Sequence, residues 1–385
     1  MARSEATPEE LRPGSRIFNG AALGSFIARF GALFGLLILI IYLSVSSPVF
    51  LTADNLSNIA RQGTVNALLA LGLLLAIITA GIDLSVGSIL AVSMCTLALM
   101  AIKWQINPFI AMFLCLLVGT FVGWLNGILL TKLHLPHPFI ATLGTMNVAR
   151  GVALIITGAS PISGFDRAGA GQVLVLGAGS LGPIPVSLLV IIVMYAIFHV
   201  MLSNTSVGRH IYAVGGNISA ARLSGINVSR TLVIVYSLSG LMAGMAALML
   251  AGRTNSGYPL AGNGAELDAI AAVIIGGASF AGGSGTVGGT AIGVILMMVH
   301  VCADIIARII TGASLPATVE IVSYYYMVLV AFLPLGWVER KRGMISVELI
   351  EFMMSPRMMK ISDATVAALA TLIYAVMAYA TWITA

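Results

Sequence analysis

Residues 78–88 read ITAGIDLSVGS, and this string interrupts an apolar stretch that extends from Val65 to Ile102. Gly81 and Gly87 lie within the string, and glycine is the residue that unwinds a helix most readily. Unwound backbone at membrane depth is tolerated only where protein or a cavity supplies hydrogen-bond partners. The string therefore predicts two short membrane helices joined by a hinge that lines an internal pathway.

The composition of the chain agrees with a membrane location. Hydrophobic residues make up 59% of the 385 residues and charged residues only 9%, whereas about 25% of an ordinary globular protein is charged. Apolar runs recur at a length that crosses the roughly 30 Å hydrocarbon layer as a helix. We therefore expect an all-α fold, a polytopic membrane helical bundle with about 10 transmembrane segments and a possible eleventh at the C-terminus. The expected spans are 30–49, 65–79, 86–102, 108–130, 139–157, 184–202, 231–251, a glycine-broken stretch at 269–293 that merges into a ninth span ending near residue 306, and 322–337.

The distribution of charge predicts how the chain is divided and oriented. Residues 1–29 are polar and are expected to form a cytoplasmic N-terminal tail, followed by a transmembrane domain at 30–342. Residues 203–230 hold four basic side chains, counting His210, and no acidic one, which predicts a cytoplasmic segment by the positive-inside rule. Residues 343–385 form a C-terminal extension, in which we expect a surface helix and a possible extra transmembrane helix.

Asp83 is the residue in the first interruption that most needs an explanation. An ionised carboxylate at mid-bilayer costs several kcal/mol unless it faces water, a partner or a helix end. One interpretation is that Asp83 lines a pathway. The other is that Asp83 or Ser85 accepts from the free backbone N–H groups at the start of the following helix. The sequence leaves both open.

A second interruption occupies residues 266–293, where a glycine-rich segment that includes Gly276 and Gly277 breaks another apolar run. Paired, glycine-interrupted segments in the two halves of a transporter point to its central pathway, so the two interruptions are expected to be counterparts. Asn147 and Arg150 lie inside a further apolar run and are expected to face the bundle interior. The expected residues of the pathway and its hinges are Gly81, Asp83, Ser85, Gly87, Asn147, Arg150, Asp268, Gly276 and Gly277.

Other glycines recur at helical spacing. Glycine occupies every fourth position at 119, 123 and 127, at 240 and 244, and at 289 and 293. Small residues at this spacing allow two helix backbones to approach closely. These glycines therefore predict close helix packing.

Residues 216–230 contain a short amphipathic stretch. Ala220, Leu223 and Ile226 are spaced to fall on one side of a helix. Such a stretch can dock onto a partner, or it can be an ordinary basic loop at the lipid surface. The spacing alone does not separate these interpretations.

The chain carries no motif for catalysis, a cofactor or a metal. No GxxxxGK[ST] phosphate loop is present, so ATP-driven work would need another subunit. His134 and His137 form an HxxH without an evident third ligand, which predicts an interfacial turn rather than a metal site. The three cysteines lie in apolar surroundings without a CxxC spacing. We therefore expect a protein that is not an enzyme and holds no cofactor or metal.

Three strings read together resemble the permease subunits of bacterial sugar ABC importers of the ribose, xylose and galactose type. They are ITAGIDLSVGS at 78–88, PFIATLGTMNVARGVALIITG at 138–158, and AARLSGINV followed by the ELDAIAAVIIGGASFAGG run. The resemblance covers residues of about 30 to 300 and fades downstream.

The resemblance implies a function and partners. Residues 30–342 would be the permease domain, two copies of the chain would form a homodimer around the pathway, cytoplasmic ATP-binding subunits would drive it, and a periplasmic sugar-binding protein would deliver a monosaccharide or polyol. The protein would lie in the bacterial inner membrane with a cytoplasmic N-terminus. The string SAARLSG resembles the core by which ABC permeases engage their ATPases, with serine where many permeases carry glutamate. The implied ATPase-coupling residues are Ser219, Ala220, Ala221, Arg222, Leu223, Ser224 and Gly225.

Two other classes of protein remain possible from the residues. In an ion-coupled secondary transporter, Asp83 or Asp268 would carry a proton or sodium ion. Uptake would then depend on an ion gradient and on no ATPase. A passive channel or binding protein would need no docking segment.

Overall fold

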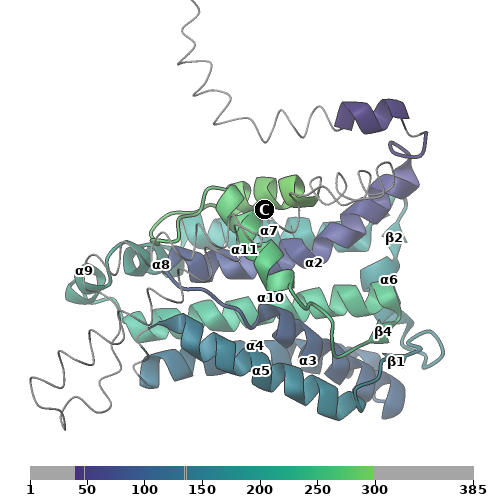
Figure 1. Cartoon of the computed structure of the whole chain (residues 1–385), viewed down its shortest axis with the longest axis horizontal. Coiled ribbons are helices and arrows are strands. Elements are labelled where there is room, and N and C mark those ends of the chain that lie inside the picture. The colour runs from purple at the N-terminus through teal and green to yellow at the C-terminus, as the bar shows by residue number, and fades with distance from the viewer. Residues whose placement is uncertain (1–39, 47, 134, 136, 299–385) are drawn as a thin grey trace, which may run out of the picture. The chain divides into compact units, whose positions relative to one another are not determined.

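The computed structural model describes residues 40–46, 48–133, 135 and 137–298. Within this part of the chain it is a bundle of helices with very short strands (Figure 1). The N-terminal tail, the tenth span, the C-terminal extension and the possible eleventh span lie outside the described residues, so the predictions for them stay predictions.

Six helices of the described part are long and apolar enough to cross a membrane. This confirms the expected polytopic helical bundle, and each helix lies within a few residues of an expected span except at the start of the first. The six spans are α2 (Ala53–Ile78), α3 (Val86–Ala98) with its short π-helical continuation (Leu99–Lys103), α4 (Pro108–Lys132), α5 (Pro138–Thr157), α7 (Val186–Asn204) and α10 (Val228–Thr254).

Shorter elements connect these spans. They are the helices α6 (Gly171–Ala178), α8 (Ser206–Gly216), α9 (Ile218–Leu223) and α11 (Ala265–Ile275), the apolar helix Val287–Met298, and the strands β1 (Ile162–Ser163), β2 (Ser180–Leu181), β3 (Ile184–Pro185) and β4 (Ser256–Gly257). The strands pair antiparallel as β1 with β4 and β2 with β3. The α8–α9 pair and the β1–β4 pair lie at opposite ends of the long helices (Figure 1).

α10 is the central helix of the bundle. It packs against α4, α2, α3 and α6, and its C-terminal half is almost entirely buried. α2 and α3 are also buried over most of their length, whereas α4, α5 and α7 expose large apolar side chains such as Phe113, Val148 and Ile192. Helices with one exposed apolar face suit a lipid environment, because lipid tails are as apolar as the side chains.

One difference from the expected fold concerns residues 52–62. They lie between the expected spans at 30–49 and 65–79, but residues 53–62 form the first turns of α2. The Thr52 hydroxyl accepts from the backbone N–H of Asn55 at 3.3 Å, and Asp54 lies in the first turn. Both features stabilise a helix start. The apolar pattern therefore marked only the buried part of a longer helix.

The predicted second interruption is also present, and residues 269–293 do not form one continuous helix. α11 ends at Gly276, and Gly277 adopts a φ of +91°, a left-handed conformation that glycine tolerates best. The chain then turns through residues 278–286 before the helix Val287–Met298 begins. A Cβ on Gly276 would meet the backbone of Gly289, so the two short helices pack against each other closely.

The repeated glycines at 119, 123, 127, 240 and 244 lie at the interface between α4 and α10, and those at 289 and 293 lie against Gly276 and Ala272. A Cβ on Gly119 would fall 2.6 Å from the carbonyl oxygen of Gly240, and one on Gly123 would overlap the carbonyl oxygen of Tyr236. A Cβ on Gly244 would approach the backbone of Leu116 at 3.3 Å. The prediction of close helix packing is confirmed.

Candidate functional site

The first interruption is present in the structure. α2 ends with a turn at Thr79 and Ala80, residues 81–83 are extended, and α3 begins at Val86. The backbone N–H groups of Ala80 and Gly81 donate to the last turn of α2, at 2.9 Å to the carbonyls of Ile77 and Ala76 respectively. The two helices are therefore separated by a short non-helical segment, as the sequence predicted.

Asp83 is fully buried in this segment, with 0% of its surface exposed. One carboxylate oxygen, Oδ1, accepts from the backbone N–H of Ser85 at 3.0 Å and from its hydroxyl at 2.6 Å. The other, Oδ2, accepts from the Ser239 hydroxyl of α10 at 2.9 Å. The interpretation in which Asp83 accepts from the start of the following helix describes this geometry. Its role in a solute pathway stays a prediction.

The hydrogen bonds continue from Asp83 to two further helices. The side-chain Nδ2 of Asn126 in α4 donates to the Ser85 hydroxyl at 2.8 Å. The Thr145 hydroxyl of α5 donates to the side-chain Oδ1 of Asn126. These buried groups join the interrupted segment to α10, α4 and α5. Neither Asn126 nor Thr145 was predicted from the sequence, and the signal available was a polar residue within an apolar run.

Gly81 and Gly87 each allow a close approach at this segment. A Cβ on Gly81 would fall 2.5 Å from the Tyr236 hydroxyl, and a Cβ on Gly87 would overlap the carbonyl oxygen of Gly262 and the carboxylate of Glu266. Gly262 belongs to the non-helical segment 255–264 that precedes α11. The start of α3 and the segment 255–264, which are distant in sequence, therefore touch at residues 87 and 262.

Arg150 of α5 holds the segment 255–264 in place. It is half-buried, and its Nη1 donates at 2.7 Å to the carbonyls of both Pro259 and Ala261. The opposite charge of Glu266 lies close enough to attract the guanidinium. No hydrogen bond to Asp83 is found among the described residues. The partner of Arg150 is therefore the backbone of this segment, and its place in a pathway stays a prediction.

Asn147 lies elsewhere. Its side chain is exposed on α5, and its Nδ2 donates to the Leu143 carbonyl of the same helix at 2.9 Å. The expectation that it faces the interior of the bundle was wrong for the single chain, because its position on α5 turns it away from α3 and α4. The hydrogen bond from its side-chain amide to its own helix lowers the free-energy cost of exposing Asn147 to an apolar environment.

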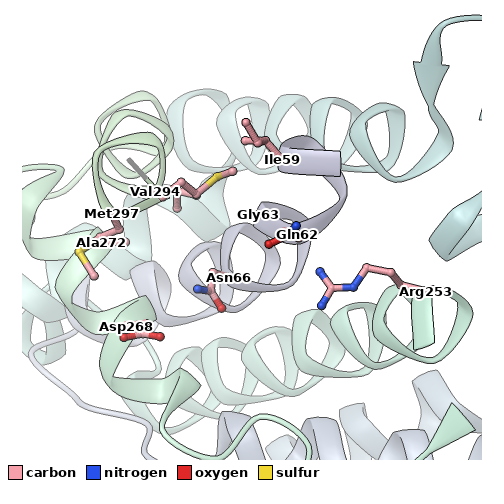
Figure 2. Close-up of a pocket in the computed structure, with 10 residues that line it drawn as sticks. Ile59, Gln62, Gly63, Asn66, Arg253, Asp268, Ala272, Val294 and Met297 are labelled. Carbon is pink, nitrogen blue, oxygen red and sulfur yellow. The ribbon is translucent and has the colours of Figure 1, made fainter. Parts of the chain in front are cut away.

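Asp268 lies in a pocket between α2, α11 and the helix Val287–Met298 (Figure 2). The cavity has a volume of about 200 Å³. Three other polar side chains line it, Gln62, Asn66 and Arg253, and the remaining lining residues are Ile59, Gly63, Ala272, Val294, Met297 and Met298. The sequence did not single out Gln62, which precedes the expected span at 65–79, or Asn66, which lies within that span.

The predicted pathway residues therefore fall in separate places. Asp83 and Ser85 belong to the packed network, Arg150 holds a backbone segment, and Asp268 lines the pocket. Gly276 and Gly277 form the turn that ends α11. The structure does not gather them into one conduit within the described part of the chain.

The predicted ATPase-coupling residues form α9 and the turn after it. Asn217 caps the helix by accepting from the Ala220 N–H at 2.9 Å, and Gly225 ends the turn with a φ of +80°. Ala221 is buried against Val214 and Val228. The other six of the predicted residues, Ser219, Ala220, Arg222, Leu223, Ser224 and Gly225, are exposed.

Leu223 is the most exposed large apolar side chain of α9, at 91%. Ile226 was expected on the same side, but it packs with Ala221 instead, because the helix ends at Leu223 and the chain turns. Arg209, His210, Arg222 and Arg230 are exposed nearby in sequence. The segment therefore presents an apolar tip with basic neighbours.

His137 also has a role that differs from metal binding. Its Nδ1 accepts from the backbone N–H of Phe139 at 3.3 Å, and it is the N-cap of α5. Burial lowers the pKa of His137 below its ordinary value. The described residues contain no group of three or more His, Cys, Asp or Glu side chains placed to hold a metal ion.

Comparisons with known proteins agree with these features. Residues 55–331 match the family described as the permease component of branched-chain amino acid transport systems. The ribose import permease protein of Bacillus subtilis (strain 168) is 43% identical over 269 residues, which cover 70% of this chain and 82% of the relative. The D-allose transport system permease protein of Escherichia coli (strain K12) is 40% identical over 271 residues, covering 70% and 81%.

A galactose/methyl galactoside import permease protein from Salmonella typhimurium is 37% identical over 280 residues, covering 69% of this chain and 82% of the relative. No solved structure matches the chain. Residues 297–385 match a second family, the DctQ component of tripartite ATP-independent periplasmic transporters, and this match overlaps the first only at 297–331. The first match covers most of the chain, and the relatives are about two fifths identical to it over about four fifths of their own length. This protein therefore belongs to the family of permease subunits of bacterial sugar ABC importers.

Proposed function

We propose that the chain is the transmembrane permease subunit of an importer that moves a monosaccharide or related polyol into the cytoplasm. In this proposal, separate ATP-binding subunits drive transport and a periplasmic binding protein delivers the solute. The observation that carries it is the exposed tip of α9, which presents Leu223 to a partner. The names of the relatives, which are permeases for ribose, allose and galactose, support the sugar as cargo.

The tip of α9 has the properties of a docking element. A helix of six residues is too short to be stable alone, so its anchorage through Ala221 holds it in place. Leu223 remains 91% exposed on this anchored helix, and burying a leucine side chain stabilises by about 1.5–3 kcal/mol. A partner that covers Leu223 therefore gains affinity without first ordering the segment.

The basic residues of α8 and α9 set the orientation in this proposal. Positive side chains in short loops are retained in the cytoplasm, and residues 203–230 hold no acidic side chain. The α8–α9 end then faces the cytoplasm, the β1–β4 end faces the periplasm, and the N-terminus is cytoplasmic. The protein lies in the inner membrane as a multi-pass subunit.

The α8–α9 element is also in contact with the interior of the bundle. Gly215 of α8 packs so closely on the C-terminal end of α2 that a Cβ would overlap the Ile78 carbonyl oxygen. The Gly283 N–H donates to the same carbonyl at 2.8 Å. A displacement of α8 by a docked partner would therefore be passed to α2 and to the turn after α11. We assign the two interruptions the role of hinges on this basis.

Two copies of the chain would enclose the solute route in this proposal, as the relatives' family implies. The pocket that contains Asp268 provides the polar surface for that route, and it lies between α2 and α11. α8 contacts α2 and the turn after α11. The permease itself performs no catalysis, and ATP hydrolysis takes place on the partner.

Uptake into membrane vesicles tests this function against an ion-coupled mechanism. The full chain is produced together with an ATP-binding subunit and a binding protein encoded near it, and uptake of labelled ribose, allose and galactose is measured. We expect uptake that requires ATP and persists when ionophores collapse the proton and sodium gradients. Uptake that is abolished by the ionophores and needs no ATP-binding subunit would overturn the proposal.

A further inference from the structure

The pocket between α2, α11 and the helix Val287–Met298 combines a polar side with an apolar side. Figure 2 shows Asp268, Asn66, Gln62 and Arg253 along one side of the cavity, with the two charged residues at its opposite ends. Val294, Met297 and Ala272 lie together at one end of the view. The pocket therefore offers hydrogen bonds along one side and apolar contact on another.

The polar side chains provide both kinds of hydrogen-bonding group. An ionised aspartate only accepts, an arginine only donates, and an asparagine or glutamine does both. A hydroxyl group donates one hydrogen bond and accepts others, so a row of hydroxyls is matched by this set. Asn66 and Asp268 are half-buried, whereas Gln62 and Arg253 are exposed, which places the more accessible groups at the mouth.

The charges of the pocket favour a neutral solute. Asp268 and Arg253 carry opposite charges at opposite ends, so an anion attracted to one end is repelled at the other. A cation meets the same conflict in reverse. A molecule without net charge avoids this repulsion. A zwitterion pairs with the two ends through its charges, and a polyol pairs with both through its hydroxyl groups.

The volume limits the solute to a small one. The cavity of about 200 Å³ is below the roughly 300–1,000 Å³ of pockets for drug-sized ligands. A single sugar ring or a short polyol is of this size, and an oligosaccharide is not.

We propose that this pocket is a binding site for a neutral, polyhydroxylated solute during its passage, with Asp268 and Asn66 as the inner hydrogen-bond partners and Gln62 and Arg253 as the outer ones. Val294 and Met297 contact the apolar C–H face of the solute. This inference rests on the proposed function, and it adds the residues that hold the cargo and the selectivity for uncharged cargo.

Methionine NMR on the purified full chain tests the site directly. The chain is labelled with ¹³C-methyl methionine in lipid nanodiscs, and the signal of Met297 is assigned by its loss in Met297→Leu. D-ribose, D-allose and D-galactose are then added one at a time at millimolar concentrations. We expect a saturable shift of the Met297 signal with at least one of them. Gluconate and glucosamine, which are of similar size but charged, are expected to give at least tenfold weaker binding.

Variants connect the signal to the polar residues. Asp268→Asn and Asn66→Ala are expected to raise the half-saturating sugar concentration at least tenfold, while Asp166→Asn and Gln105→Ala, which lie outside the pocket, leave it unchanged. Thermal melting of each variant shows whether it is folded. A deoxy sugar that lacks the hydroxyl held by Asp268 is expected to bind wild type more weakly, with no further loss of affinity in Asp268→Asn. This result identifies the hydroxyl. A merely structural role of Asp268 would not give it.

The outcomes separate this inference from the proposed function. If ATP-driven uptake is present, but no neutral sugar shifts Met297 and Asp268→Asn transports at the wild-type rate, the pocket assignment is wrong and the importer function stands. If the sugars shift Met297 and no ATP-driven uptake is found with any ATP-binding partner, the pocket stands and the importer mechanism fails.

Discussion

Gly123 of α4 and Gly240 of α10 lie in direct backbone contact, since a Cβ on Gly123 would fall 2.9 Å from the Gly240 Cα and a Cβ on Gly240 would fall the same distance from the Gly123 Cα. Helices that approach this closely gain van der Waals contact along their backbones, the main source of helix association in lipid. The contact fixes α10 against α4, and α10 in turn carries Ser239, the partner of Asp83.

A valine at either glycine is expected to separate the two helices. Gly240→Val must displace backbone atoms, and overpacking of this kind costs about 1–3 kcal/mol or more. We expect a clear fall in the melting temperature of the purified protein in detergent. Gly151→Val on α5 is the matched control, because nothing lies within 4 Å of a Cβ there. Equal melting of the two variants would contradict the packing described.

The sequence predicted the elements that obey a repeating pattern. Such patterns are the glycines at every fourth residue, the apolar spans and the break at residues 79–85. Each of these features is present in the structure. The sequence missed Gln62 because a helix start carries polar residues that resemble a loop. It missed Asn66 because one polar residue inside an apolar span does not by itself indicate a pocket. It misplaced Asn147, since which face of α5 meets its neighbours depends on tertiary packing. Pairings such as Asn126 with Ser85 depend on contacts distant in sequence, which no local pattern encodes.

The second prediction concerns the hydrogen bond between Ser239 and Asp83. Ser239→Ala removes one donor from a fully buried carboxylate, and a buried group left short of a partner costs about 1–3 kcal/mol, more when it is charged. We expect the variant to melt at a lower temperature. Ser237→Ala is the control, because its hydroxyl donates only to the Val233 carbonyl of its own helix. If Ser239→Ala melts like the control, the network does not stabilise the interruption.

The third prediction tests the tip of α9. Leu223→Asp places a charge on a surface that the proposed partner covers, so we expect at least a tenfold loss of ATP-binding subunit in co-purification. Melting of the permease alone stays unchanged, because Leu223 is 91% exposed. Leu181→Asp, at a 64% exposed leucine of β2, is the matched control. Loss of the partner in both variants, or in neither, would refute the assignment of α9.

Gly225 offers a related test by strain instead of charge. Its φ of +80° is strongly disfavoured for a β-branched residue, while nothing lies within 4 Å of a Cβ at this position. Gly225→Val is therefore expected to change the turn after α9 without a steric clash. Membrane insertion should be retained and docking of the ATP-binding subunit weakened, as measured by co-purification. Wild-type docking would show that the turn does not position α9.

The fourth prediction concerns Arg150, whose guanidinium donates to two backbone carbonyls of the segment 255–264. Arg150→Met keeps an unbranched, flexible side chain, although a shorter one, and removes both hydrogen bonds. We expect faster hydrogen exchange at the amides of Ala261 and Asn263, measured by mass spectrometry in nanodiscs. Arg167→Met, at an exposed arginine, should leave their exchange unchanged. Unaltered exchange in Arg150→Met would show that the segment is held by other contacts.

The fifth prediction is a pH dependence that arises at His137. Burial lowers the pKa of His137, and its Nδ1 must be unprotonated to accept from the Phe139 N–H. The unfolded chain has a histidine pKa of about 6.5, so it takes up the proton at a higher pH than the folded protein does. The stability from this cap is therefore complete above about pH 6.5 and is lost as the pH falls through the lowered folded pKa.

His137→Asn isolates this contribution, because asparagine also caps helices but does not titrate. We expect the wild-type melting temperature to fall more between pH 7.5 and pH 5 than that of His137→Asn, with a difference that corresponds to about 1 kcal/mol, the usual contribution of a cap. His210→Asn is the matched control at an exposed histidine elsewhere. The same pH profile in wild type and His137→Asn would exclude a neutral imidazole cap at the start of α5, since only a group whose pKa differs between the folded and unfolded states makes stability depend on pH.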